Sequence, residues 1–468
     1  MKRLASLTTF VLLSACSLAP DYTPPDVKSP VAYKETGAWR VAAPADTQPK
    51  GSWWTAFGDE ALNDLESRII QDNQTFKAGA ARLVQAHSAV RQARAGLFPQ
   101  IGGSASAARS RRSQTTTPKI TPPEYTDDKV SLSISYEVDL WGRIGNAIEA
   151  ANDEYSASAQ DLSALELALR TELAVDYFSL RGADASIRIL KQTIETDQSA
   201  LDLVIRRHDG GIAAQADVAQ AQAQLELAKT QLAEVSLKRA QLEHAIAVLM
   251  GMAPADFQVP ENPLAGDPPP FAPGLPSTLL ERRPDVAAAE RRMAAANARI
   301  GIARAAWFPV FDLGALIGLG TGSPGSLLQA SSAIWALGPG TLTQTIFDGG
   351  RIKGQNEQAQ AVFDETVANY RQTTLNAWLE VEDQLAALRH LEDESQTQTK
   401  AIAAEREALT QARYRYQAGI VTYLEVIVNQ NALLSAELAD SDIRLRRLTA
   451  DILLVKGLGG GWERSPPE

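Results

Sequence analysis

The chain contains very little cysteine and histidine. Cys16 is the one cysteine among 468 residues, so no disulfide can form within one chain and packing must supply the stability. The four histidines lie far apart without the spacing of metal ligands; they are His87, His208, His244 and His390. We therefore predict no metal site, and surface or packing roles for the histidines.

Long apolar runs are also missing. No segment after the N-terminus holds 18 consecutive apolar residues, so the sequence predicts no transmembrane helix. A chain of this kind that crosses a membrane must do so as β-strands. The formal net charge of −11 argues against nucleic acid as a partner and suits a surface or lumen that favours cations.

Catalytic motifs are absent from the sequence as well. Gly320, Gly322 and Gly325 spell GxGxxG, but Pro324 lies inside the motif and no βαβ pattern surrounds it. A glycine loop at a strand end explains it better. The many carboxylates fall on amphipathic helices, where they form solvated faces. We predict that the protein is not an enzyme and has no cofactor.

The N-terminus has the pattern of a lipoprotein signal. Lys2 and Arg3 precede an apolar stretch that ends in Leu13-Ser14-Ala15-Cys16. We expect cleavage after residue 15 and a covalent lipid on Cys16, which changes the formal charge from −11 to −13 because Lys2 and Arg3 are lost. The alternatives are an ordinary signal peptide with an incidental cysteine, or a short membrane anchor. The apolar run is far shorter than the roughly 20 residues of a spanning helix.

The mature chain is one unit written twice. Gly142-Arg143-Ile144 returns as Gly350-Arg351-Ile352, and the stretch around Gly211 returns around Gly419, both at an offset of 208 residues. "ARAGLFP" at 93–99 likewise matches "ARAAWFP" at 303–309. We divide the chain into a signal peptide (1–15), an acylated tether (16–58), a first repeat (59–251), a proline-rich linker (252–278), a second repeat (279–457) and a tail (458–468).

Each repeat contains a short β-like region. In "KVSLSISYEVDLW" apolar and polar residues alternate, as in a strand with one face toward lipid. The predicted lipid-facing residues are Val130, Leu132, Ile134, Tyr136, Val138 and Leu140. The alternative is a half-buried strand of a soluble sheet. Partner strands are expected near 99–109 and 311–319, with a fourth, irregular at Pro339, near 334–347.

Strand number bears on assembly. A membrane-crossing strand needs about 9–11 residues, which each of these segments supplies. Four strands cannot close a barrel, and the eight strands of two chains would enclose only side chains. An open pore therefore needs at least three chains.

Long helices fill the rest of each repeat. The pattern over residues 143–208 predicts a helix of roughly 100 Å at 1.5 Å per residue. The pattern over residues 60–96 predicts a second, shorter helix. Gly211 and Gly419 interrupt the long helical stretches, and we expect each long helix to end and the chain to reverse there. Glycine suits such a turn because it tolerates positive φ at a helix C-terminus. A soluble coiled coil is the alternative for the helices alone.

Several stretches together resemble a known family. "CSLAPDYTPP", "WWTAFGDEALNDL", "ERRPDVAAAERRMAAANARIGIARAAWFPVFDL" and "IFDGGRI" are similar to the TolC and OprM outer-membrane efflux family, in its NodT-type lipoprotein branch. The resemblance implies a mainly α fold with a small β part. In it, a trimeric outer-membrane β-barrel with four strands per chain continues into a long periplasmic α-helical barrel. It also implies a periplasmic membrane-fusion adaptor and an inner-membrane transporter as partners, besides outer-membrane lipid.

The resemblance also implies a gate at the periplasmic helix tips. By position, Asp217 and Tyr416 match a closing link between neighbouring helices, and Leu424 matches an apolar constriction. Glu425 matches one carboxylate of a cation-binding ring. The chain departs from the TolC pattern at Val421, which replaces an arginine, and at Val428, which replaces the second carboxylate.

Two functions of different classes follow. The first is the outer-membrane channel of a tripartite efflux system, a passive exit duct fed by a pump through the adaptor. The second is a structural or adaptor-like periplasmic coiled-coil lipoprotein. The alternating strands favour the channel, since an adaptor has no use for a lipid-facing band.

Overall fold

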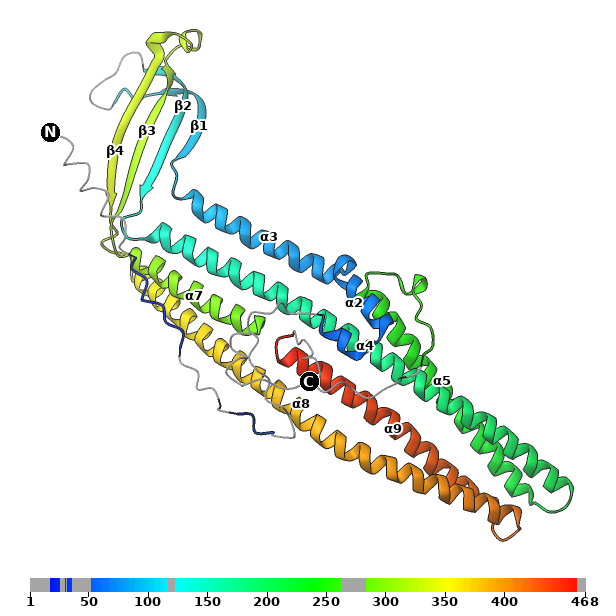
Figure 1. Ribbon diagram of the computed structural model, residues 1–468. Helices are drawn as coiled ribbons and strands as arrows, with labels where there is room; N and C mark the ends of the chain where they lie inside the picture. Colours follow the sequence, from blue (N-terminus) through cyan, green and yellow to red (C-terminus); the bar gives the residue numbers. More distant parts are fainter. Residues whose placement is uncertain are drawn as a thin grey trace. The chain divides into compact units, whose positions relative to one another are not determined.

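The structure is a computed structural model that describes residues 17–25, 30, 32–35, 52–115, 123–262, 264 and 283–460 (Figure 1). The signal peptide and Cys16 therefore lie outside the described residues, as does most of the predicted linker. The chain forms two compact units. The first comprises Met1–Asp26, Arg82–Ala159 and Ala288–Arg371, and the second comprises Val27–Ala81, Gln160–Ala287 and Gln372–Glu468. Each unit takes segments from both sequence repeats.

Helices make up most of the described chain. They are α2 (Glu60–Asp72), α3 (Gln74–Ala95), α4 (Arg143–Asp209), α5 (Gln215–Leu249), α7 (Pro284–Ala305), α8 (Arg351–Gln417) and α9 (Tyr423–Gly457). The long helices α4 and α8 both have 67 residues, and α5 and α9 both have 35. The members of each pair begin 208 positions apart, so the duplication predicted from sequence extends to the helix ends.

Local chemistry sets where the long helices begin. Gly142 and Gly350, with φ of 69° and 92°, let the chain turn before α4 and α8. A carboxylate then accepts an orphan amide of the first turn. Asp139 accepts from the Gly145 N–H at 2.7 Å, and Asp348 accepts from the Ile352 N–H at 2.9 Å.

The helix predicted across residues 60–96 is wrong in one respect, because it is two helices. Asn73 separates α2 from α3 with an extended backbone at ψ 121°. Its carboxamide accepts the Phe76 N–H at 2.8 Å and donates to the Leu249 carbonyl at 2.8 Å. Asparagine competes for backbone groups in this way and so favours the start of a helix over its middle.

The first unit contains an antiparallel sheet in the order β1-β2-β3-β4 (Figure 1). The strands are β1 (Gln100–Arg111), β2 (Glu124–Val138), β3 (Val310–Thr321) and β4 (Ala333–Thr343). The fourth strand forms as predicted, and the register shifts between Leu313 and Ala315, opposite the segment that contains Pro339. Leu140, predicted as a strand residue, lies in a bend beyond the end of β2.

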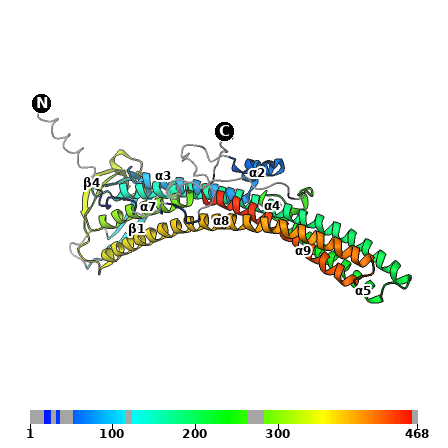
Figure 2. The same ribbon diagram turned by 60° about the horizontal axis from the view of Figure 1, so that its bottom comes forward.

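The second unit has two apolar clusters. The larger one joins α2, α4, α8 and α9 through side chains such as Leu62, Leu173, Tyr177, Leu385 and Ile452. The smaller one joins the far ends of α4, α5, α8 and α9, where α4–α5 and α8–α9 lie side by side as hairpins (Figures 1 and 2). The larger cluster packs the helices together far from the hairpin turns. The smaller cluster packs them together next to the turns.

Candidate functional site

The two hairpin turns have the same geometry. Gly211 and Gly419 have φ of 73° and 75°, a region that costs other L-residues free energy. The Ile212 N–H donates to the Arg207 carbonyl at 2.8 Å, and the Ile420 N–H donates to the Arg415 carbonyl at 2.9 Å. This bond from the second residue after the helix, together with a bond from the glycine N–H to the carbonyl three residues earlier, forms the Schellman motif.

The turns present apolar side chains to the surroundings. Ile212 is 71% exposed and Ile420 is 68% exposed, and they occupy equivalent places in the two turns. Nothing lies within 4 Å of a Cβ placed on Gly211 or Gly419. The glycines are thus required by backbone conformation and not by crowding.

Tyr416 lies at the centre of the smaller apolar cluster. Its ring is 7% exposed, with the Arg207 guanidinium 4.6 Å above it and the Tyr423 ring 5.3 Å away. Burial raises the pKa of Tyr416, the Arg207 charge opposes this, and the Asp217 charge adds to it. Within the described part of the chain its buried hydroxyl has no hydrogen-bond partner.

Asp217 lies near enough to Tyr416 for its charge to act on the tyrosine hydroxyl. Its carboxylate accepts the Ala214 N–H at 3.4 Å, in the first turn of α5. The structure thus brings Asp217, Tyr416 and Arg207 into one electrostatic group. Arg207 was not predicted, because its role depends on α4 packing beside α8.

Leu424 and Glu425 begin α9. Leu424 is 51% exposed, as is Val428 at 58%. Glu425 forms an ion pair with Arg415 of α8, which the sequence did not predict. An acidic side chain in the first turn of a helix also interacts favourably with the helix dipole. In the single chain Glu425 is therefore a paired carboxylate beside an exposed leucine.

A polar layer joins the hairpins next to the smaller cluster. Asp197 of α4 accepts a hydrogen bond from Gln430 of α9, and both side chains are buried. Gln224 of α5 and Asn431 of α9 exchange two hydrogen bonds at 2.6 and 3.0 Å. Burial raises the pKa of Asp197 to about 6, while the Arg413 charge and the Gln430 bond oppose the rise.

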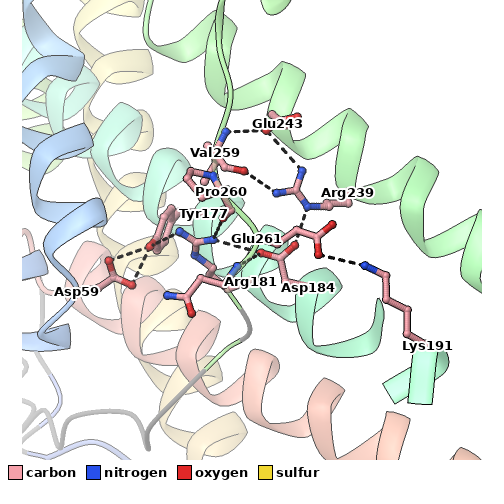
Figure 3. A network of polar contacts seen from close by, with 11 residues as sticks. Asp59, Tyr177, Arg181, Asp184, Lys191, Arg239, Glu243, Val259, Pro260 and Glu261 are labelled. Carbon is pink, nitrogen blue, oxygen red and sulfur yellow. Dashed lines mark hydrogen bonds and ion pairs between the residues drawn. The ribbon is translucent and has the colours of Figure 1, made fainter. Parts of the chain in front are cut away.

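A second polar network holds the end of the first repeat (Figure 3). Asp184 accepts from Arg239 at 2.6 Å, from Arg181 at 3.2 Å and from the Asn262 N–H at 2.9 Å. Asp184 is 1% exposed, so its charge depends on these three donors. The network joins α4 to α5 through the contact between Asp184 and Arg239.

The same arginines hold the chain that follows α5. Arg239 donates to the Val259 carbonyl at 2.7 Å, and Arg181 donates to the Pro260 carbonyl at 2.7 Å (Figure 3). Tyr177 extends the network by donating to the Asp59 carboxylate at 2.7 Å. Segment 259–262, part of the predicted linker, is thus fixed to α4 and α5.

The sheet has one apolar face. Residues paired across an antiparallel sheet point to the same side, and Leu132 and Ile317 pair in this way, as do Ile317 and Trp335. Their exposures of 51%, 61% and 79% show that none of the described residues covers them. This face carries all five predicted residues that belong to β2: Val130, Leu132, Ile134, Tyr136 and Val138.

The opposite face is polar along β2, and Leu316 of β3 and Ile334 of β4 also point to it. It carries Ser131 and Ser133 of β2, and the Ser131 hydroxyl lies 3.0 Å from that of Ser104 on β1. Gly318 on β3 fits closely here, since a Cβ would lie 2.3 Å from the Val130 carbonyl oxygen. The two faces therefore suit different surroundings.

The described parts of the predicted tether that lie between residues 17 and 35 are docked on helices. In the first unit the Ser17 hydroxyl donates to Asn146 at 2.8 Å, and Asn297 donates to the Pro20 carbonyl at 2.7 Å. In the second unit Glu382 accepts the N–H groups of Lys34 and Glu35 at 2.6 and 3.0 Å. These partners lie on distant helices, so no local sequence signal could reveal them.

Among the described residues, no three or more His, Cys, Asp or Glu side chains lie together in a way that could hold a metal ion. In the same residues, no helix combines the length and apolar character needed to span a membrane.

Comparison with known proteins agrees with this geometry. Residues 65–252 and 275–460 match the family described as outer membrane efflux protein. The chain is 32% identical to the probable efflux pump outer membrane protein TtgC of Pseudomonas putida, over 98% of this chain and 96% of that protein. It is 31% identical to outer membrane protein OprJ of Pseudomonas aeruginosa, again over 98% and 96%. The outer-membrane channel OprN superposes with a TM-score of 0.87 at 27% identity, covering 96% of this chain and all of OprN.

These findings define the class as an outer-membrane channel of an efflux system. The chain belongs to the outer membrane efflux protein family. The prediction of an efflux channel in the outer membrane is confirmed, and the adaptor-like alternative is not. The predicted fold, mainly helical with four strands per chain and a two-fold repeat, is confirmed as well.

Proposed function

We propose that three copies of this chain form one passive exit duct. The duct receives substrates from an inner-membrane transporter through a periplasmic membrane-fusion adaptor. The observation that carries this proposal is the sheet with one bare apolar face and one polar face, because four strands with such faces need further copies to enclose a pore. The helix tips would lie at the periplasmic end, where the adaptor docks.

The apolar face of the sheet would lie against outer-membrane lipid. Ile134 stands in β2 on the apolar face and Ser133 on the polar face, and both are exposed in the single chain. Ile134→Arg should cost about 2–4 kcal/mol if residue 134 faces the middle of the bilayer. Ser133→Arg is the matched control and should be milder. Equal recovery of both variants in outer-membrane fractions would refute the lipid-facing assignment.

Cys16 would carry the lipid that anchors the N-terminus. The support is the Leu13-Ser14-Ala15-Cys16 pattern and the docking of Ser17 against Asn146. Mass spectrometry of the mature protein should find an acylated Cys16 at the N-terminus. Cys16→Ser should lack the lipid, whereas an unmodified N-terminus at another residue in the parent would contradict the proposal.

The hairpin tips would form the gate. Leu424 is half exposed, which supports an apolar constriction formed with its copies, and three copies of Glu425 would gather near the axis. Carboxylates that are held close together attract cations. The Arg415–Glu425 pair gives each carboxylate a counter-charge, and so we expect a moderate cation site. Glu425→Ala should lessen block of the conductance by divalent cations, and the test is titration of the current in planar bilayers.

Opening would follow from adaptor binding. The exposed Ile212 and Ile420 give the adaptor apolar contacts at both turns. An adaptor that prefers the open arrangement shifts the population toward it by its difference in affinity. Replacement of both isoleucines by serine should weaken co-purification of the adaptor while leaving conductance of the isolated channel unchanged.

A further inference from the structure

Two arginines lie at the end of the sheet farthest from the helices. The helices α3, α4, α7 and α8 join the strands at one end, and the β1–β2 and β3–β4 connections form the opposite, distal end (Figure 1). Arg109 pairs across the sheet with Thr126 of β2. Arg111, the last residue of β1, pairs with Glu124. Thr126 and Glu124 lie an even number of residues from Val130 on β2, so both arginines point to the apolar face.

Arg109, Arg111 and Glu124 form a distal patch, in which two guanidinium groups share one carboxylate. Glu124 pairs with Arg109 at 3.0 Å, and these side chains are 49% and 77% exposed. Arg111 is exposed as well. Among the described strand residues on the apolar face, the one other charged residue is Asp128, which is 9% exposed. The distal patch therefore presents a net positive charge next to an apolar surface.

The cations on the opposite face of this end already have partners. The Arg112 guanidinium lies 4.7 Å from the centre of the Tyr125 ring. Lys129 forms an ion pair with Asp127 at 2.7 Å. Tyr125, Asp127 and Lys129 alternate along β2 with the residues of the apolar face and so point away from it. Among the cations of the described strands, those of the distal patch are therefore the ones that suit an external anion.

The height of the distal patch on the sheet matches a layer of lipid headgroups. Val130 is the last apolar residue of β2 on the apolar face before this end. Arg109, opposite Thr126, lies about 14 Å farther along the strand at roughly 3.4 Å per residue. With strands tilted by about 40°, this is about 10 Å along the axis of a barrel. The headgroup layer on each side of a bilayer is about 5–8 Å thick, and the long arginine stem can reach back toward it.

We propose that the distal patch binds phosphate groups of lipid headgroups in the outer leaflet. A guanidinium group donates two parallel, charge-assisted hydrogen bonds to a phosphate. Arg109 and Arg111 stand about 7 Å apart on one face of β1, so both can hold the headgroup of one phosphorylated lipid. The edge of the apolar face favours a lipid over a soluble anion, because acyl chains can lie on that face. This inference rests on the proposed function, which sets the apolar face against lipid, and it adds the headgroup contact.

Binding of lipid A, which carries two phosphates, tests the distal patch. The whole detergent-purified protein is mixed with lipid A, and native mass spectrometry measures the bound fraction over a range of lipid concentrations. The parent should bind lipid A. The double variant Arg109→Gln/Arg111→Gln should bind it about tenfold or more weakly, since charge-assisted hydrogen bonds are lost. Glu124→Gln should strengthen binding, because it removes the carboxylate that competes for Arg109.

Arg112→Gln is the matched control. It removes the same charge at the same end of the sheet, but from the opposite face, so it should bind lipid A as the parent does. The inference is overturned if the double variant binds as the parent does, or if Arg112→Gln loses binding equally. Equal binding of dephosphorylated lipid A would also overturn it, as would displacement of lipid A by inorganic phosphate. The same spectra show that each variant compared is assembled.

Conductance separates this inference from the proposed function. A parent protein that conducts in planar bilayers but binds no lipid A overturns the headgroup contact and leaves the channel proposal standing. A parent protein that neither conducts nor binds lipid A overturns both.

Discussion

The hairpins α4–α5 and α8–α9 have equal lengths and equal turns, yet different polar contacts join their helices. Between α4 and α5, Asp184 pairs with Arg239 at 2.6 Å, and these side chains are 1% and 13% exposed. Between α8 and α9, Arg406 pairs with Glu437 at 2.9 Å and Arg446 pairs with Glu394 at 2.9 Å, with arginines 64% and 46% exposed. Thus a buried network joins the helices of the first hairpin, whereas the ion pairs of the second each have at least one largely exposed member, Arg447–Glu392 included.

This difference indicates that the two hairpins have come to differ in rigidity since the duplication. Removing one member of a buried charge pair is costly, whereas exposed pairs contribute little and are screened by salt. The first hairpin also holds segment 259–262 through the same arginines. We therefore expect α4–α5 to act as the fixed element and α8–α9, which carries Leu424 and Glu425, to be the one that rearranges.

Loss of the buried carboxylate should have the largest effect. Asp184→Ala leaves Arg181 and Arg239 without their shared acceptor and should cost about 3–5 kcal/mol of unfolding free energy. Thermal unfolding of the detergent-extracted protein, followed by circular dichroism, measures it. Asp442→Ala, which removes an exposed pair on α9, is the control. Similar losses in the two variants would remove the contrast between the hairpins.

Acidification should tighten the contact between the hairpins. The pKa of Asp197 is raised to about 6 by burial, whereas an unfolded aspartate ionises near pH 3.9. The folded form therefore binds more protons between these values, and the stability that this group contributes rises as the pH falls from about 6 toward 3.9. We expect slower hydrogen exchange at Gln430 and its neighbours at pH 5.5, after correction for intrinsic exchange.

Asp197→Asn is the matched variant for this pH effect. It keeps an acceptor for Gln430 but cannot ionise, so the pH dependence should disappear. The charged and titratable groups close to Asp197 are Arg413 on α8 and Tyr423 on α9. An unchanged pH profile in Asp197→Asn would assign the effect to another group.

The two turns should respond alike. Gly211→Ala and Gly419→Ala each place a Cβ at positive φ with open space around it, so each should cost about 1–2 kcal/mol through backbone strain. The two unfolding midpoints should fall by similar amounts. A large difference between them would show that one turn has contacts with its surroundings that the other lacks.

The exposed pairs should give the smallest effect. Arg406→Ala should cost about 0.2–1 kcal/mol, and the loss should shrink when salt is raised. Limited proteolysis at 50 mM and 500 mM salt measures it, with cleavage in α8–α9 expected to rise more than cleavage in α4–α5. Equal salt dependence of the two hairpins would contradict the proposed difference in rigidity.

Much of the fold could be predicted because the relevant signals are local or repeated. The 208-residue offset predicted paired helices, and the glycines at 211 and 419 predicted the turns through their tolerance of positive φ. Alternation of apolar and polar residues predicted β2, although it placed Leu140 one step too far. Asn73 carried a visible capping signal that the helical pattern around it obscured.

The polar contacts could not be predicted in the same way. Arg181, Asp184 and Arg239 look like ordinary charges on helical faces, and only the packing of α4 on α5 turns them into a buried network. Arg415 and Glu425 likewise become partners only when the second hairpin closes. The docking of Ser17 and Glu35 depends on Asn146 and Glu382, more than a hundred residues away.

If the tips of the second hairpin restrict the channel, as proposed, the conductance of Leu424→Ser should reveal it. Leu424 is half exposed at the start of α9, and its repeat counterpart on α5 is Ala216. Single-channel recordings in planar bilayers should show higher conductance for Leu424→Ser than for the parent, and parental conductance for Ala216→Ser. Parental conductance in both variants would contradict a constriction at Leu424.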